Sequence, residues 1–167
     1  MAQTYEPIST NTLGSATNSV TFSSIPSTYT DLVLVCTGTN SSGFDGIDIR
    51  VGNGSVDTGS NYGMVAVNGN GTNAQSFRDV NNTSMTNMGI TGSSTRQASI
   101  LHFMNYANTS MFKAVLGRSS IKDFRVAGLG AIWRSTSAIN TIQLRSDNAS
   151  YNFTVGSTFT LWGIKEA

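Results

Sequence analysis

The side chains that could carry out acid–base, nucleophilic or metal chemistry are few in this chain, and they are scattered. Glycoside hydrolysis needs two carboxylic acids facing each other across a cleft, but the only glutamates, Glu6 and Glu166, lie near the two ends of the sequence. The single histidine, His102, has no cysteine partners with which to build an ordinary zinc site. It lies in the run SILHFMNY, between Ile100 and Met104, where we expect a residue of the core or of an interface. The sequence therefore predicts no catalytic residue, no cofactor and no enzyme activity.

One segment carries several oxygen ligands of the kind that calcium prefers. The run FDGIDIRVGNGSVDTGSN holds Asp45, Asp48, Asn53 and Asp57 among glycines. Their spacing does not match an EF-hand loop, and the alternation of GIDIRV places Asp48 on the outer, wet face of a strand. We expect a turn-rich, solvated end of a hairpin, and the pattern leaves open whether Asp45, Asp48 and Asp57 bind a cation.

Two further features resemble functional motifs incompletely. The only cysteine, Cys36, has no histidine or basic residue near it in sequence, which predicts a small buried hydrophobic residue and not a reactive thiol. Gly128 and Gly130 in VAGLGAIW lack the third glycine and the following helix of a dinucleotide-binding loop. We interpret these two glycines as making room for Trp133 beside a neighbouring strand.

The elements that would position any site are short apolar runs closed by Ser, Thr, Asn or Gly, with almost no helical periodicity between them. Their spacing predicts an all-β protein, an antiparallel, jelly-roll-like β-sandwich of about nine or ten strands. The pair 99–106 and 111–116 predicts a hairpin with a four-residue turn. The strands are expected at residues 19–25, 31–37, 46–51, 62–67, 99–106, 111–116, 125–134, 139–145, 151–155 and 159–164.

The pattern favours one domain with an N-terminal extension. Residues 1–18 are expected to form an N-terminal arm and first strand, and residues 19–167 a single β-sandwich domain. Residues 69–95 are predicted to be a long polar loop, in which 75–80 could form a short strand and 81–95 lie at the surface. Shortening the stretch 81–93 is accordingly expected to leave the fold intact.

The composition is poor in charge and rich in small polar residues. Only 11% of the residues are charged, against about 25% in an average domain, while there are 23 serines, 21 threonines and 16 asparagines. A net charge of +1 gives no field to attract nucleic acid or anionic lipid, and no run approaches the roughly 20 apolar residues of a membrane span. The first residues also lack a secretory signal. We therefore expect synthesis in a cytoplasm, no nucleic-acid or membrane partner, and contacts with identical neighbours.

Aromatic and arginine side chains are the remaining candidates for contacts with a partner. Most aromatic residues fall at alternating strand positions, which favours core packing over a sugar-stacking platform. Arginine outnumbers lysine by seven to three, and its planar guanidinium suits flat or aromatic partners. The candidate surface or partner contacts are Tyr62, Phe77, Arg78, Asn82 and Arg96.

Both ends of the chain resemble small virion proteins of tailed bacteriophages, especially phages of cyanobacteria. The opening matches the family pattern at Ile8 and Leu13, and the close matches it with Trp162 where tyrosine is usual. The match thins out over residues 69–95. The matching motifs are VTFSSIP at 20–26, Y-x-D-L-x-L at 29–34, SNYG at 60–63, I-x-x-I-x-L at 139–144 and F-x-x-G-S-x-F-x-L-W-G-I at 153–164.

The resemblance implies a jelly-roll-like protein on the virion surface, assembled in the host cytoplasm, and it carries over no catalytic residue. Such proteins occur as homotrimers that decorate the head or as components of tail fibres. Our first expectation is a capsid decoration (cement) protein that binds the major capsid protein. The alternatives are a tail-fibre or receptor-binding module that reads host surface glycans through residues 69–95, and a free carbohydrate-binding module.

Overall fold

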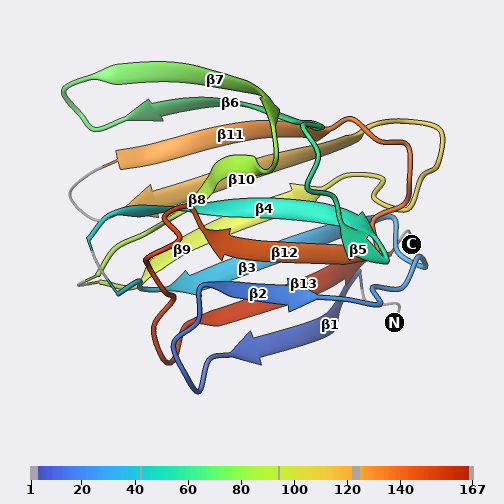
Figure 1. The fold of residues 1–167 in the computed structure, drawn as a ribbon, viewed down its shortest axis with the longest axis horizontal. Coiled ribbons are helices and arrows are strands. Elements are labelled where there is room, and N and C mark those ends of the chain that lie inside the picture. The colour runs from blue at the N-terminus through green and yellow to red at the C-terminus, as the bar shows by residue number, and fades with distance from the viewer. Residues whose placement is uncertain (1–3, 42, 94, 122–124, 166–167) are drawn as a thin grey trace.

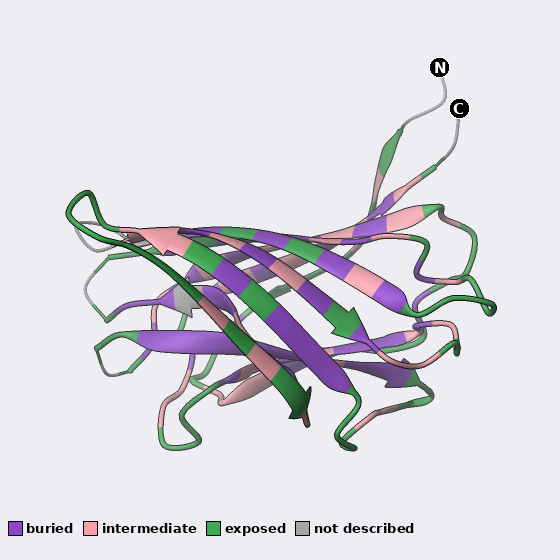
Figure 2. Ribbon diagram, turned by 90° about the horizontal axis from the view of Figure 1, so that it is seen from above, coloured by how far each residue is buried: buried purple, intermediate pink, exposed green. Residues whose placement is uncertain are grey.

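The protein is a sandwich of two antiparallel β-sheets. A computed structural model describes residues 4–41, 43–93, 95–121 and 125–165, and within them it contains thirteen strands and no helix. The sheets stack face to face, as Figures 1 and 2 show. The predicted all-β sandwich is thus confirmed, whereas its jelly-roll character stays a prediction.

The two sheets differ in size. The larger sheet has eight strands, in spatial order β1 (Tyr5–Thr12), β13 (Thr158–Ile164), β3 (Asp31–Gly38), β9 (Gln97–Phe103), β10 (Lys113–Ile121), β11 (Arg125–Trp133), β6 (Tyr62–Gly69) and β7 (Ala74–Asn82). The smaller sheet has five, which are β2 (Ser19–Phe22), β12 (Thr141–Ser146), β4 (Asp45–Asn53), β5 (Ser55–Val56) and β8 (Met85–Thr91), the last paired with β4.

The core lies between the sheets and is built largely from alternate residues of strands such as β3, β9, β11 and β13. Leu161 of β13, Leu34 of β3 and Leu101 of β9 lie opposite one another in the register, and all three are fully buried. Gly117 of β10 continues this row, where a Cβ atom would lie only 2.8 Å from Leu101 Cδ2. Burying a leucine side chain contributes about 1.5–3 kcal/mol, so such rows hold the large sheet against its partner.

Residues 69–95, predicted to be a long polar loop, consist mainly of strands β7 and β8. β7 confirms the short strand allowed at 75–80, whereas β8 lies where a surface loop was expected. β7 forms the edge of the large sheet, and β8 pairs with β4 while packing against β9, β10 and β11. Met85 and Met88 are fully buried there. The prediction of a surface loop at 81–95 failed because Gly and Asn disfavour a strand on propensity alone, whereas here tertiary packing of two methionines decides. The expectation that 81–93 can be shortened is therefore wrong.

Other expectations need smaller changes. Within residues 1–18, where an arm and a first strand were expected, the strand is β1, which pairs with β13. In 151–155 only Phe153 makes isolated bridges, to Thr17 and Asn40, so no strand forms. The hairpin of β9 and β10 is confirmed, but its loop is longer than four residues.

Met88→Ala should lower the free energy of unfolding by about 2–5 kcal/mol, because it leaves a cavity in the core beneath β8. Met111→Ala makes the same chemical change where the side chain is 47% exposed, and it should change stability by less than about 0.5 kcal/mol. Urea unfolding measures both. Equal, small effects of the two substitutions would contradict the buried position of β8.

Candidate functional site

The outer face of the large sheet, which points away from the small sheet, carries exposed aliphatic side chains on five neighbouring strands. Burial alternates from residue to residue along β11 and from Met64 to Val67 of β6. Figure 2 shows such alternation in strands of the sandwich. The outward side chains keep 38–67% of their surface exposed. They are Val65, Val67, Val80, Ile100, Leu116, Val126 and Ile132, and we call these seven residues the apolar face.

The pairing register arranges this face in rows that run across the strands from β7 to β9. Residues directly opposite each other in antiparallel strands lie on the same side of the sheet. The first row is Arg78, Val65, Gly130, Leu116 and His102, and the second is Ser76, Val67, Gly128, Arg118 and Ile100.

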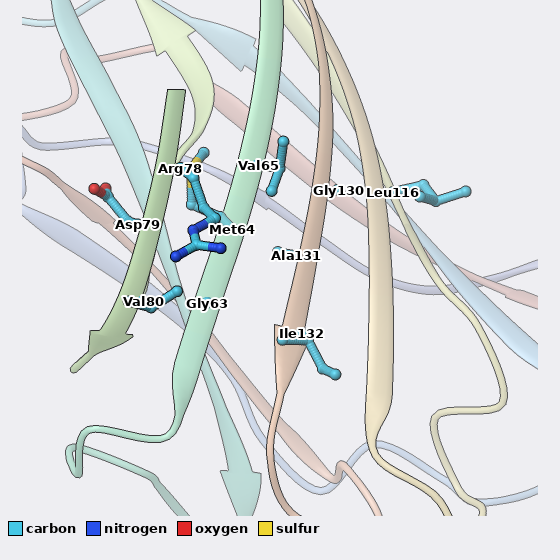
Figure 3. Close-up of a pocket in the computed structure, with 10 residues that line it drawn as sticks. All are labelled: Gly63, Met64, Val65, Arg78, Asp79, Val80, Leu116, Gly130, Ala131 and Ile132. Atoms are coloured by element: carbon cyan, nitrogen blue, oxygen red, sulfur yellow. The ribbon is translucent and has the colours of Figure 1, made fainter. Parts of the chain in front are cut away.

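β11 contributes a glycine to both rows, and the missing side chains leave a groove along this strand. Above Gly130 lies a hollow of about 400 Å³, bounded by Val65, Leu116 and Ile132 among others (Figure 3). A second hollow, of about 420 Å³, lies above Gly128 and shares Leu116 as a wall. We call these two hollows together the β11 groove.

The two glycines are not needed to fit Trp133, as the sequence had suggested. Trp133 points into the core and is 3% exposed, whereas Gly128 and Gly130 lie on the opposite side of the strand. A Cβ atom on Gly128 would lie 3.6 Å from Val67 Cγ2, and one on Gly130 would lie 3.9 Å from Leu116 Cδ2. These are ordinary contacts, so core packing does not require glycine at either position, and that interpretation is wrong.

Charged side chains border the groove on both sides. Arg78 comes from β7 and Arg118 from β10, and among the described residues neither makes a hydrogen bond or an ion pair. Figure 3 shows Arg78 extending toward β6 while Asp79 points to the other side of β7. Arg118 lines the hollow above Gly128. The groove is therefore apolar along its length, with cationic groups at its edges.

His102 lies on this outer face, where its side chain is 37% exposed, and not in the core. Its Nε2 atom lies 2.8 Å from Oδ2 of Asp31. The backbone N–H of Asn105 donates to the other oxygen of that carboxylate at 2.8 Å. Asp31 thus holds the imidazole beside Leu116 at the end of the first row.

The structure separates the five contact residues that the sequence suggested. Arg78 borders the β11 groove, whereas Arg96 donates to the carbonyl oxygen of Gly156 at 2.7 Å, away from it. Phe77 is half-buried against the core. Asn82 is half-buried and lies opposite Tyr62 in the register.

Tyr62 is fully buried, so the prediction that it is a surface contact is wrong. Its hydroxyl group lies 2.9 Å from the carbonyl oxygen of Val51 and 2.8 Å from that of Asp57. Burial raises the pKa of Tyr62 to about 12. The residue ties β6 to the small sheet, which is a structural role.

The aspartates that could have bound a cation lie apart. Asp48 is 1% exposed, and accepts hydrogen bonds from the Ser84 hydroxyl at 3.0 Å and the Asn87 backbone at 3.1 Å. Its expected wet outer position is wrong, because residues 83–87 cover it. Burial raises the pKa of Asp48 and of Asp45 despite their hydrogen bonds. Within the described ranges, no three His, Cys, Asp or Glu side chains gather as a metal site would require.

Asp57 organises a turn after β5. Its carboxylate accepts hydrogen bonds from Trp133 Nε1 at 2.7 Å, Asn61 Nδ2 at 2.8 Å and the Gly59 backbone at 2.7 Å. Burial alone would raise the pKa of this carboxyl, but the three hydrogen bonds outweigh it and lower the pKa below its ordinary value. The ionised form is therefore the one that the folded state stabilises.

Sequence reasoning missed the apolar face itself. A strand with apolar residues on both sides can also be a central strand buried on both faces. The signal was present in MVAV at 64–67, where Met64 and Ala66 already supply the core and Val65 and Val67 are left over. A strand with this pattern cannot be distinguished from a fully buried strand until it is known that the small sheet covers only one side of the large sheet.

Comparisons with known proteins add little to this geometry. No family model matches the chain, and no curated protein matches it. Among solved structures, a protein of unknown function from Shewanella oneidensis MR-1 aligns over 98% of this chain and 77% of its own, with 9% identity and a TM-score of 0.27. Nor does any described segment of the chain form a helix long and apolar enough to cross a bilayer.

Gly128→Ala and Gly130→Ala should fold with unchanged or slightly higher stability, because each methyl group meets only ordinary contacts and alanine lowers the entropy of the unfolded chain. Gly117→Ala, the matched inward change on β10, should be destabilising by about 1–3 kcal/mol through overpacking against Leu101 and Leu129. Thermal and urea unfolding decide this. If Gly128→Ala or Gly130→Ala lowered the stability as much as Gly117→Ala, the open space above these two glycines would be refuted.

Asp57→Asn should destabilise the fold more at pH 7 than in acid. The pKa of Asp57 is lowered in the folded state, so its contribution is present above the ordinary value of 3.8 and is lost as the pH falls through the folded pKa. Urea unfolding of wild type and variant, measured from pH 7 downward past pH 4, should show the two curves converging. A difference in the free energy of unfolding that does not change with pH would contradict a stabilising role of the ionised Asp57 carboxylate.

Proposed function

We propose that this protein is a structural component of a bacteriophage virion, a decoration protein that binds the major capsid protein on the head as a homotrimer. The observation that carries the proposal is the apolar face, on which seven aliphatic side chains are 38–67% exposed along one side of the large sheet. A face of this kind is suited to a flat protein surface. The protein acts by binding, and no step of chemistry is assigned to it.

The size of the face agrees with this role. The seven side chains expose roughly 600 Å² of aliphatic surface, the upper end of what single patches on monomeric proteins reach. A stable protein interface buries about 800 Å² on each partner, which the face and its bordering residues together can supply. At about 25 cal/mol per Å², the aliphatic portion alone represents roughly 15 kcal/mol before the costs of association.

The sequence supports the same conclusion independently. The motifs resemble phage virion proteins, and the strands that they overlap, β2, β3, β6, β12 and β13, occur in the fold. A net charge of +1 and 11% charged residues limit repulsion between many identical copies on one particle.

The alternative of a glycan-reading tail-fibre module depended on a long loop at 69–95 and on an exposed Tyr62. That region instead forms β7 and β8, and Tyr62 is fully buried. No observation in the described residues favours this alternative over decoration of the head.

Val67→Asp should abolish binding of the purified protein to undecorated heads of the phage that encodes it, because it places a charge in the centre of the apolar face. Val155→Asp is the matched control, since Val155 is 61% exposed in a turn outside this face. Co-sedimentation with heads measures both, and circular dichroism verifies folding. A decoration protein should also be present in hundreds of copies per particle, which quantitative mass spectrometry of the virion measures. A copy number of a few tens or fewer, or equal binding of the two variants to heads, would overturn the proposal.

A further inference from the structure

We propose that the β11 groove binds an extended protein segment that carries carboxylate side chains on either side of an aliphatic one. This inference rests on the proposed function and names the chemistry of the partner surface. It follows from three observations: the shape of the groove, the unpaired charges that border it, and the lack of a free carboxylate on the described residues of the face.

The groove forms a slot that receives one side chain of an occupant, and a segment that reaches both arginines crosses it. Its floor includes the backbone of β11 at Gly128 and Gly130, Val65 and Ile132 line the hollow above Gly130, and Leu116 lines both hollows. The floor lies in the middle of five strands, where both neighbouring backbones are already paired. An occupant therefore contacts the groove with side chains, and an aliphatic one fits between Val65 and Leu116.

The charges at the edges specify what should flank that aliphatic side chain. Within the described residues, Arg78 and Arg118 have no acidic partner and no hydrogen bond. Of the nearby carboxylates, Asp31 is bound by His102 and Asn105, and Asp79 accepts from Thr86 Oγ1 at 2.7 Å. Arginine binds carboxylates with two parallel hydrogen bonds. Two guanidinium groups without partners beside an apolar slot therefore favour an acidic and aliphatic ligand.

The register gives the spacing of the two charges. Arg78 and Arg118 are separated by three strand spacings and one row, which places their Cα atoms roughly 16 Å apart, mainly across the strands. Two residues four apart in an extended chain are about 13 Å from each other, and they point to the same side with the residue midway between them. A segment of the pattern Glu-x-Val-x-Glu thus presents two carboxylates and one aliphatic side chain to this face.

A second copy of the same face is a poorer occupant. Face-to-face packing would bring four unpaired arginine side chains together and would add no free carboxylate, because the face itself has none among the described residues. The trimer expected from the family resemblance therefore uses other surfaces. An anionic membrane carries negative charge, as the proposed segment does, but it does not present one aliphatic side chain between two carboxylates. It serves as a control in the test.

The test measures fluorescence anisotropy of labelled synthetic peptides with the full-length protein. The probe is Ser-Glu-Thr-Val-Thr-Glu-Ser, and its controls replace both Glu by Gln or by Lys. We expect the Glu peptide to bind at least about tenfold more tightly than the Gln peptide, since two charge-assisted hydrogen bonds are lost. Its affinity should fall as salt is raised, and the Lys peptide should not bind.

Variants of the protein assign the effect to the groove. Arg78→Glu combined with Arg118→Glu should reverse the preference toward the Lys peptide, whereas Arg96→Glu, outside the groove, should leave the preference for Glu unchanged. Gly128→Ala combined with Gly130→Ala fills the floor without a clash and should weaken the Glu peptide at least about fivefold while keeping the charges. Urea unfolding of each variant excludes loss of fold.

Three results would overturn the inference. They are equal binding of the Glu, Gln and Lys peptides, binding to phosphatidylglycerol vesicles in place of the peptide, and self-association in sedimentation that the Arg78 and Arg118 reversals abolish. Co-sedimentation with heads separates the two proposals. If the double Arg variant still decorates heads as wild type does, only the acidic-segment inference fails, and if wild type does not bind heads, the proposed function fails.

Discussion

Neighbouring residues of a β-strand point to opposite sides of the sheet, and in this protein both sides of three adjacent strands are aliphatic. The small sheet covers only one of these sides. Inward residues of β6, β10 and β11 therefore make the core, while outward ones such as Val65, Leu116 and Ile132 stay 38–51% exposed. This unequal covering is the constraint from which the rest follows, since it creates a rigid apolar surface that the fold itself does not use.

Glycine has opposite meanings on the two sides of the large sheet. Gly117 faces inward, where a Cβ atom would come within 3.2 Å of Leu129 Cδ1 and closer still to Leu101. It is required by packing. Gly128 and Gly130 face outward, where a methyl group would be accommodated. Their lack of side chains shapes a groove and does not relieve a clash. Glycine therefore reflects tight core packing in β10 and an open surface in the neighbouring strand β11.

Much of the fold could be predicted from the sequence, because strands such as β3 and β11 carry long apolar runs bounded by turn residues. β8 could not, since its burial rests on Met85 and Met88 in an otherwise polar stretch. The alternation in β4 located Asp48 on the right side of its strand. It could not show that residues 83–87 cover that side, because alternation reports direction and not what lies above. For the same reason the apolar face was missed, while Tyr62 was taken for a surface contact because it lies next to the polar stretch.

The ends of the described chain lie together at one edge of the large sheet. β1 and β13 pair along their length, and the Lys165 backbone donates to the Thr4 carbonyl at 3.1 Å. β13 is four strand positions from β11, or roughly 19 Å at the usual spacing. A polypeptide attached before β1 or after β13 would thus leave the sandwich at an edge of the large sheet that the β11 groove does not reach.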